Sequence, residues 1–423
     1  MPPVAANVNI DLGAGNSLAT HLRMLLTATR FQGIVRARQM LHGNTCPHRV
    51  VAGYMRGAGN RREREWPHPI WVQLFPFERQ MTSRERVVTA LRCEEPDRVP
   101  SVEIGIDRAL AEHLMGWGDA DSQAMNLEEN FYTAQEALAL ADRLGLDSLS
   151  YVKRAPVFAE KLPGQDGRLF YGEGQIREMA DLDKLSLPDP NDDSLYEDAE
   201  RFVENKGERA ACFVTRIGIF PTMLSMGMER FSVALFENRD FVEAVLDWYC
   251  DWMLVLADRM CDLGFDVFVS TDDLAFNTAP FFSPEVFRDV VLPRYRKISE
   301  VITIPWIIHS DGNLLPFVDD LLTLGISGLH PLEKGAMDIR SVKREYGDRL
   351  CLLGNVDLNL LGMGTPEEVE AEVRGLIEDV GPGGGYILSS GNSLAGYLLP
   401  ENVMAMSSAG RKYGTYPIEK GRA

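Results

Sequence analysis

The chain has 423 residues, of which 45% are hydrophobic and 25% charged, a composition typical of one large or two medium globular domains. The net charge of −19 argues against a general binder of nucleic acid or anionic membranes, and no run of about 18 apolar residues predicts a membrane span. Six cysteines without a CxxC pair argue against a zinc ribbon or disulfide framework and favour a reducing cytoplasm.

Residues 1–80 differ in composition from the rest of the chain. They contain ten arginines, no lysine and four acidic residues, a net charge of +6, whereas the other 343 residues carry −25. They could be a translated upstream region before a true start at Met81, an arginine-rich transit peptide, or an ordered appendage packed through HPIWVQLFPF (68–77). We expect a poorly ordered or non-native extension (1–80), followed by one catalytic domain (81–423).

A helix and a strand are predicted directly after Met81. Thr82 and Glu85 have the spacing of a capping box at the start of a helix. Pro96 marks the end of that helical pattern, and RVPSVEI (98–104) then predicts a strand.

The carboxyl half contains five short apolar runs that end in polar residues and precede helical patterns. The runs cover residues 265–273, 304–312, 326–333, 349–357 and 385–392. The helical patterns cover residues 283–301, 313–323, 336–346, 365–379 and 400–412. Thr365 followed by Pro366 is a strong helix start. Such alternation predicts a parallel sheet covered on both faces.

Two parallel architectures compete. A doubly wound sheet should carry a glycine-rich phosphate loop, but GPGGGY (381–386) precedes a strand and does not open a helix. A (β/α)8 TIM barrel fits residues 81–423 and would bring all polar strand ends to one mouth, where barrel enzymes carry their catalytic groups. We therefore expect an α/β fold of the TIM-barrel type. The polar strand-end residues are Asp272, Asp273, His309, Asp311, Glu333, Asn355, Asp357 and Asn392.

An imidazole and nearby carboxylates make the strongest catalytic candidates. His309 and Asp311 share a face if their strand continues. Of Asp272 and Asp273, only one should face the mouth, because adjacent side chains on an extended backbone point oppositely. A solvated loop and a satisfied core histidine are the ordinary alternatives. We expect these aspartates and His309, together with Glu333, to act as general acids and bases in catalysis.

The same mouth suggests substrate contacts and a metal site. His309, Asp311 and Glu333 could provide three ligands to a catalytic zinc ion, although this set is unusually rich in hard oxygen ligands. Gly312 permits a sharp turn, and Asn313 is expected to cap the next helix. The expected substrate contacts are Arg108, Arg216, Asn355, Asp357 and Asn392.

From Met81 to Pro417 the chain resembles the uroporphyrinogen decarboxylase superfamily, which includes corrinoid-dependent methyltransferases. The matching segments are SRERVVTALRCEEPDRVP (83–100), IGIFPTMLSMGMERF (217–231), STDDLAFNTAPFFSPEVFRDVVLPRY (270–295), HSDGN (309–313), LHPLEKGAMDI (329–339), LGNVD (353–357) and GGGYILSSGN (383–392). The resemblance implies a barrel enzyme, and dimers are common in this fold family.

The decarboxylase branch of that superfamily has an arginine-rich PxWxMRQAGRY motif that binds the carboxylates of a tetrapyrrole. The equivalent stretch here, VPSVEIGIDRALAEH (99–113), contains only Arg108. YMRGAGNRR (54–62) looks similar but precedes the capping-box helix, so we interpret it as a coincidence. Asp272 or Asp273 would occupy the position of the catalytic aspartate. Without paired arginines in this stretch, a substrate with many carboxylates is hard to anchor.

The methyltransferase branch is more similar around HSDGN. Its thiol-specific members bind zinc through a His-x-Cys pair and a later Cys, where this chain has His309, Asp311 and Asn392. The departure favours an enzyme that demethylates an oxygen or nitrogen compound and passes the methyl group to reduced cobalamin on a partner protein. His309, Asp311 and Glu333 would protonate the leaving group or hold a metal ion that activates it.

Three functions therefore remain as hypotheses. We expect methyl transfer from a small O- or N-methylated substrate to a corrinoid protein. The alternatives are decarboxylation of uroporphyrinogen or a related tetrapyrrole in porphyrin metabolism, and a non-catalytic barrel that serves as a binding module. The candidate cofactors are zinc and, if the chain is a methyltransferase, cobalamin on a partner protein. The expected partner is a small-molecule substrate, a corrinoid protein and a second copy of the chain are further candidates, and no nucleic acid or membrane partner is expected.

Overall fold

The structure is a computed structural model that describes residues 34–38, 49–55, 71–73, 80–117, 130, 132–163 and 169–418. The chain divides into two compact units, Met1–Gln80 and Met81–Ala423. In the first unit, β1 (Ile34–Arg38), β2 (Arg49–Met55) and β3 (Trp71–Gln73) form an antiparallel sheet. Most of YMRGAGNRR lies outside the described residues.

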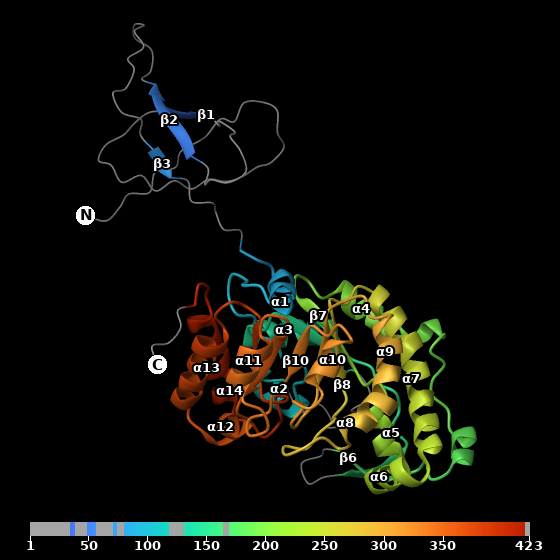
Figure 1. Ribbon diagram of the computed structural model, residues 1–423. Helices are drawn as coiled ribbons and strands as arrows, with labels where there is room; N and C mark the ends of the chain where they lie inside the picture. The colour runs from blue at the N-terminus through green and yellow to red at the C-terminus, as the bar shows by residue number, and fades with distance from the viewer. Residues whose placement is uncertain are drawn as a thin grey trace. The chain divides into compact units, whose positions relative to one another are not determined.

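Seven parallel strands form the central sheet of the second unit (Figure 1). They are β4 (Ser148–Val152), β7 (Ala210–Thr215), β8 (Val267–Thr271), β9 (Trp306–His309), β10 (Gly328–His330), β11 (Cys351–Val356) and β12 (Tyr386–Ser390). The spatial order β12-β11-β10-β9-β8-β7-β4 follows the chain order. The parallel α/β sheet predicted from the sequence is confirmed, and the last five strands lie within their predicted ranges.

Residues 99–106 form isolated bridges rather than a continuous strand. Ser101 pairs in parallel with Leu388 of β12, and Ile106 pairs with Leu394. On the other side, the Asp147 N–H, just before β4, donates to the Ser101 carbonyl at 2.7 Å. The strand predicted around residues 98–104 is therefore present only as a segment that contacts both outermost strands of the sheet.

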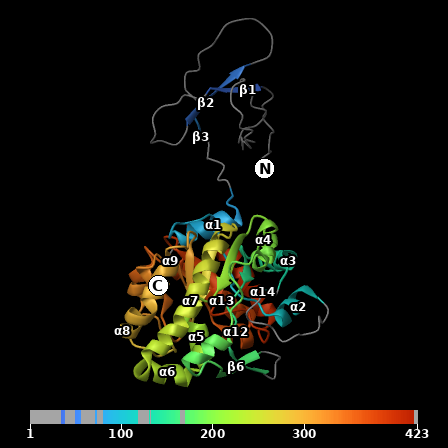
Figure 2. The same cartoon turned by 90° about the vertical axis from the view of Figure 1, so that its right-hand side faces the viewer.

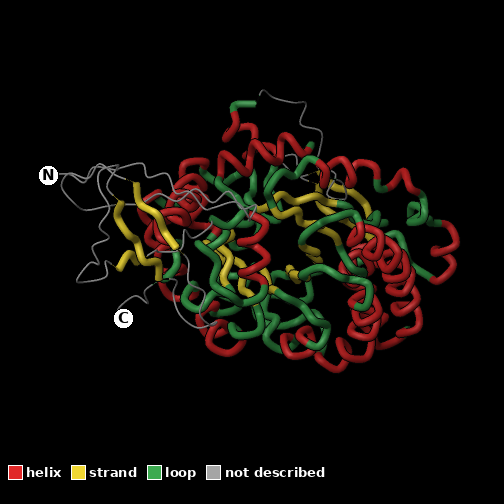
Figure 3. The backbone as a smooth tube through the Cα atoms, turned by 90° about the horizontal axis from the view of Figure 1, so that it is seen from above, coloured by secondary structure: helices red, strands yellow, loops and turns green. Residues whose placement is uncertain are grey.

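Helices lie along the outside of the strands (Figures 2 and 3). They are α1 (Ser83–Leu91), α2 (Arg108–Met115), α3 (Ala134–Leu144), α4 (Glu197–Glu204), α5 (Ile219–Met226), α6 (Met228–Glu237), α7 (Arg239–Asp262), α8 (Pro284–Val286), α9 (Leu292–Ser299), α10 (Val318–Leu322), α11 (Ile339–Tyr346), α12 (Leu358–Met363), α13 (Pro366–Val380) and α14 (Pro400–Tyr413). The shorter elements are the hairpin β5 (Ala159–Pro163) and β6 (Leu169–Gly174), two 3-10 turns (Met179–Lys184 and Asp193–Leu195) and a π-helical turn (Phe287–Val291). Within the described residues, no helix is long and apolar enough to cross a membrane.

Two of the helix caps predicted from the sequence are confirmed, and one is wrong. Thr82 and Thr365 both form capping boxes, with Glu85 and Glu368 respectively. Asn313 does not cap α10, which starts five residues later, at Val318. Its side-chain oxygen instead accepts from the Leu315 N–H at 3.1 Å. Such a local turn is the usual competitor of helix capping for asparagine.

Helix α1 covers the amino-terminal ends of the strands. Arg84 bonds to Asp266 at 2.5 Å and Arg86 to Asp147 at 2.6 Å, and these two acids immediately precede β8 and β4. The apolar side of α1 joins a buried cluster with residues from the strands, including Val214 and Ile307. The carboxyl ends of the strands therefore remain as the edge where polar side chains can meet a substrate.

Candidate active site

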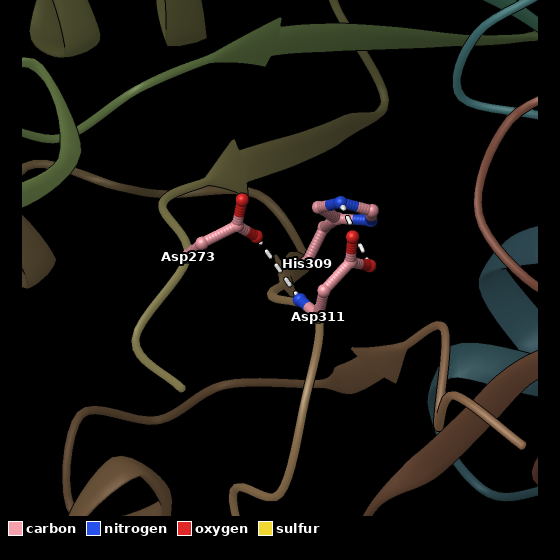
Figure 4. Close-up of side chains that lie close together, drawn as sticks. All are labelled: Asp273, His309 and Asp311. Carbon is pink, nitrogen blue, oxygen red and sulfur yellow. Dashed lines mark hydrogen bonds and ion pairs between the residues drawn. The ribbon is translucent and has the colours of Figure 1, made fainter. Parts of the chain in front are cut away.

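Asp273, His309 and Asp311 lie together at the carboxyl ends of β8 and β9 (Figure 4). One ligand atom from each residue lies within 4.8 Å of the others. Asp273 Oδ1 accepts from the Asp311 backbone N–H at 3.0 Å, and His309 Nε2 lies 3.8 Å from Asp311 Oδ1. We refer to these three residues as the acid–imidazole cluster.

The two adjacent aspartates after β8 have different roles. Asp272 is 2% exposed, and its oxygens accept the backbone N–H groups of Ile217, Gly218 and Phe220 at 2.5, 3.2 and 3.0 Å. A carboxylate at the start of α5 stabilises the helix dipole. Asp272 is therefore bound to the backbone, and Asp273 is the aspartate that reaches the acid–imidazole cluster.

A second histidine sets the orientation of His309. The Nδ1 atoms of His309 and His330 lie 2.6 Å apart, so one must carry a proton that the other accepts. His330 Nε2 lies 3.1 Å from Ser389 Oγ. Burial and the charge of His309 lower the pKa of His330 well below its usual value, although a backbone hydrogen bond to Ser390 acts in the opposite direction. In the tautomer in which His330 carries its proton on Nε2, His309 donates from Nδ1 and its Nε2 lone pair faces Asp311.

The surroundings lower the pKa of His309 and raise the pKa of Asp311, so that the usual order of the two values is reversed. Burial, followed by the charges of Arg154 and Arg216, lowers the pKa of His309 to about 3. Burial, followed by the charges of Asp273 and Glu333, raises the pKa of Asp311 to about 7. Near neutral pH the imidazole is thus an uncharged base or ligand, while Asp311 is the group that can carry a transferable proton.

Asp311 has one oxygen held and one oxygen without a partner. Its Oδ2 accepts from Asn392 Nδ2 at 2.6 Å, whereas its Oδ1 is buried and has no hydrogen-bond partner among the described residues. The next residue, Gly312, has φ +84°, and a Cβ there would lie 2.5 Å from the Phe276 carbonyl oxygen. Its N–H donates to Glu333 Oε2 at 3.1 Å. Burying Asp311 Oδ1 without a partner costs free energy unless this orphaned oxygen binds a proton, a cation or a ligand.

The donor set fits a divalent cation that accepts nitrogen and oxygen ligands. Three protein ligands are the usual number for a catalytic ion that keeps an open position. The set predicted from the sequence was His309, Asp311 and Glu333. The structure groups Asp273 with the first two residues, while Glu333 binds the Gly312 N–H. With one imidazole and two carboxylates, the cluster offers more hard oxygen ligands than a typical zinc site does.

Three of the residues expected to contact the substrate are bonded to other residues of the protein. The Arg108 guanidinium bonds to Glu112 at 3.2 Å and Glu136 at 2.9 Å. Asn355 Nδ2 donates to the Leu332 carbonyl at 2.7 Å. Asp357 caps α12, because its side chain accepts from the Asn359 N–H at 2.8 Å. In contrast, Asn392 contacts the acid–imidazole cluster.

The residues behind this cluster were not predicted from the sequence. Glu103 lies on the 99–106 segment and accepts from the Ser390 N–H and Oγ, both at 2.7 Å. Burial raises the pKa of Glu103 to about 8. Arg154 follows β4, a strand that was not predicted. A charged residue within the apolar stretch RVPSVEI was the available signal for Glu103, and the position of His330 next to His309 was visible only once the strands were paired.

The chain is similar to two kinds of known enzyme. A family model described as uroporphyrinogen decarboxylase (URO-D) matches residues 82–413. The methylcobamide:CoM methyltransferase MtbA of Methanosarcina acetivorans is 23% identical over 345 residues, which cover 79% of this chain and 99% of that protein. A uroporphyrinogen decarboxylase of Alkalilimnicola ehrlichii is 23% identical over 353 residues, covering 77% and 93%. A solved structure of a methyltransferase from Methanosarcina mazei has the same fold, with a TM-score of 0.62, 21% identity, and coverage of 79% of this chain and 99% of that chain.

Proposed function

We propose that this chain, which belongs to the uroporphyrinogen decarboxylase family, transfers a methyl group from a small O- or N-methylated substrate to a corrinoid protein. The observation that carries the proposal is the acid–imidazole cluster, in which an uncharged imidazole and a protonatable carboxyl converge. Enzymes named methylcobamide:CoM methyltransferase use a methylated cobamide as the methyl donor, so the similarity supports a cobamide as one of the two reactants, and transfer toward the cobamide is part of our proposal.

The geometry suits protonation of a leaving group. Removing a methyl group from an ether breaks a carbon–oxygen bond, and the departing oxygen must gain a proton or a cation. The partner's reduced cobamide supplies the electron pair for the new bond to the methyl carbon. Asp311, with a pKa of about 7, donates its proton to the departing oxygen, and its carboxylate is reprotonated after product release. A quaternary amine would leave as a neutral amine and would need no proton.

A divalent ion is the alternative activator at the same place. Asp273, His309 and Asp311 would hold it, and it would polarise the leaving oxygen as a Lewis acid. The orphaned Asp311 Oδ1 supports this version. A hydrogen bond with His330 would hold the His309 imidazole so that the lone pair of His309 Nε2 faces the ion. Histidine ligands of metal ions are commonly oriented by a hydrogen bond to their other ring nitrogen.

We further propose that the sheet closes into the (β/α)8 barrel expected from the sequence. Residues 99–106 would be the eighth member, because they bridge to β12 and accept a hydrogen bond from the residue before β4. Pro100 has no N–H to give to a ladder, which is consistent with the isolated bridges. Closure would place all strand ends around one mouth.

Decarboxylation of a tetrapyrrole is the second candidate function. The specific observation in its favour is that Arg154 and Arg216 lie near enough to His309 to lower its pKa, so that cationic groups do face the mouth. Decarboxylases are also as similar in sequence as the methyltransferases. A non-catalytic binding barrel is disfavoured, because binding alone does not require an uncharged imidazole beside a carboxyl group with a raised pKa.

Methyl transfer can be tested with the purified chain and a reduced corrinoid protein. Methylated cobamide should form from methylated substrates, as followed by its absorption spectrum. His309→Ala should abolish transfer, while His113→Ala, on the exposed face of α2, should not affect it. Conversion of uroporphyrinogen without an added partner protein would instead establish decarboxylation.

A further inference from the structure

Arg216 has two buried guanidinium nitrogens that find no hydrogen-bond acceptor in the described part of the chain. It directly follows β7, the neighbour of β8 in the sheet. The residue is 6% exposed, and its Nε and Nη1 atoms are buried and have no partner among the described residues. The guanidinium carbon lies 5.1 Å from the ring centre of Phe220 and 5.8 Å from that of Tyr171. A buried charged donor without an acceptor is costly, so a ligand is expected to provide one.

The neighbouring carboxylates are held by other donors. Asp272 is bound by three backbone N–H groups at the start of α5, and Asp273 accepts from the Asp311 N–H. No carboxylate of the described residues lies within ion-pair distance of Arg216, since every ion pair found there joins other side chains. The charge of Arg216 acts on Asp272 and Asp273 at longer range, but its Nε and Nη1 atoms remain available to a bound anion.

Arg154 adds a second cation at the adjacent strand end. It lies two residues beyond β4, which pairs with β7. Burial and the charge of Arg216 lower the pKa of Arg154, and both arginines lower the pKa of His309. Guanidinium groups nevertheless keep their proton in proteins. Asp272 and Asp273 offset part of the repulsion between these two charges, and an anion bound near both arginines would offset more of it.

We infer that Arg154 and Arg216 form an anion subsite beside the acid–imidazole cluster and that the methyl donor carries a carboxylate bound there. The planar guanidinium matches a carboxylate in charge and shape. A doubly charged phosphate would suit the mouth less well, because Asp272 and Asp273 already offset part of the positive charge. The carboxylate end would lie at β4 and β7, and the methylated oxygen or nitrogen would face Asp311.

The inference rests on the proposed function for the identity of the methyl donor, but binding of the anion can be tested separately. Calorimetric titration of the full chain would compare three acids with neutral counterparts: benzoate with benzamide, 4-methoxybenzoate with 4-methoxybenzamide, and trimethylglycine with choline. We expect at least one acid to bind tenfold or more tightly than its counterpart. Arg216→Met should remove this preference without changing the affinity for the neutral molecule.

Two further variants keep the test decisive. Arg154→Met should weaken the same acid if Arg216→Met fails to fold. Arg239→Met, which removes an arginine paired with Glu243 on the surface of α7, should bind like the wild type. Equal affinity for every acid and its counterpart, or a preference that survives both mouth variants, would overturn the inference. Demethylation of a neutral substrate as efficient as that of its acid would also overturn it while leaving methyl transfer intact, whereas carboxylate binding without any methyl transfer would defeat only the proposed function.

Discussion

Replacing Asp311 by asparagine should stabilise the protein while removing its activity. Asparagine keeps the size of the side chain, and its oxygen can still accept from Asn392. The pKa of Asp311 is raised from 3.8 to about 7, which corresponds to roughly 4 kcal/mol between charged and neutral forms if nothing screens the charge. Because the side chain is 34% exposed, solvent screening should reduce this to about 1–2 kcal/mol.

The direction of the pH dependence follows from the raised pKa. The folded protein holds the Asp311 proton more tightly than the unfolded chain does, so the contribution of this group to stability is complete below about pH 4 and is lost as the pH rises through about 7. Asp311→Asn has no such loss. It should therefore exceed the wild type in free energy of unfolding by about 1–2 kcal/mol near pH 8, and by about a third of that near pH 5.

Urea unfolding at both pH values, in the presence of a chelator, would measure the difference. Asp338→Asn is a matched control, since the pKa of Asp338 is lowered by the Ser341 hydroxyl and nearby backbone N–H groups, and its charge is therefore favourable. That control should show no gain near pH 8. A gain of equal size at both pH values, or a loss near pH 8 without metal, would refute the reasoning. Added zinc should stabilise the wild type more than Asp311→Asn if the cluster holds a metal ion.

Two other predictions follow from the second unit. His330→Leu removes the hydrogen bond between the Nδ1 atoms of His309 and His330, so zinc affinity or methyl transfer should fall about 10- to 100-fold; calorimetry and cobamide absorbance would measure this, and a loss of similar size in His113→Leu would argue against a specific role. A variant that begins at Met81 should unfold cooperatively at a melting temperature within a few degrees of the full chain, because Met81–Ala423 has its own core and its first helix is capped locally; aggregation or non-cooperative unfolding in calorimetry would contradict the dispensability of residues 1–80.

The parts of the fold that were predictable from the sequence are those with local causes. The last five strands are near-continuous apolar runs, because both faces of a parallel strand are covered. The capping boxes at Thr82 and Thr365 depend on neighbours three residues away. Asn313 was misread because a turn at Leu315 competes for the same side chain. Residues 99–106 form isolated bridges, and their partners lie near both outermost strands of the sheet, which no local pattern records.

The properties of the candidate site depend on distances that no local pattern contains. A His, an Asp and a Gly after an apolar run indicated a mouth, but Asp311 acquires its raised pKa from burial and from Asp273 and Glu333, which belong to neighbouring strand ends. His309 becomes an uncharged base through burial and through two arginines that follow β4 and β7. The mouth is thus divided into a cationic side and an acidic side. In the proposed reaction, this division would orient a substrate that has an anion at one end and a methylated atom at the other, because the arginines attract the anion and the carboxylates repel it.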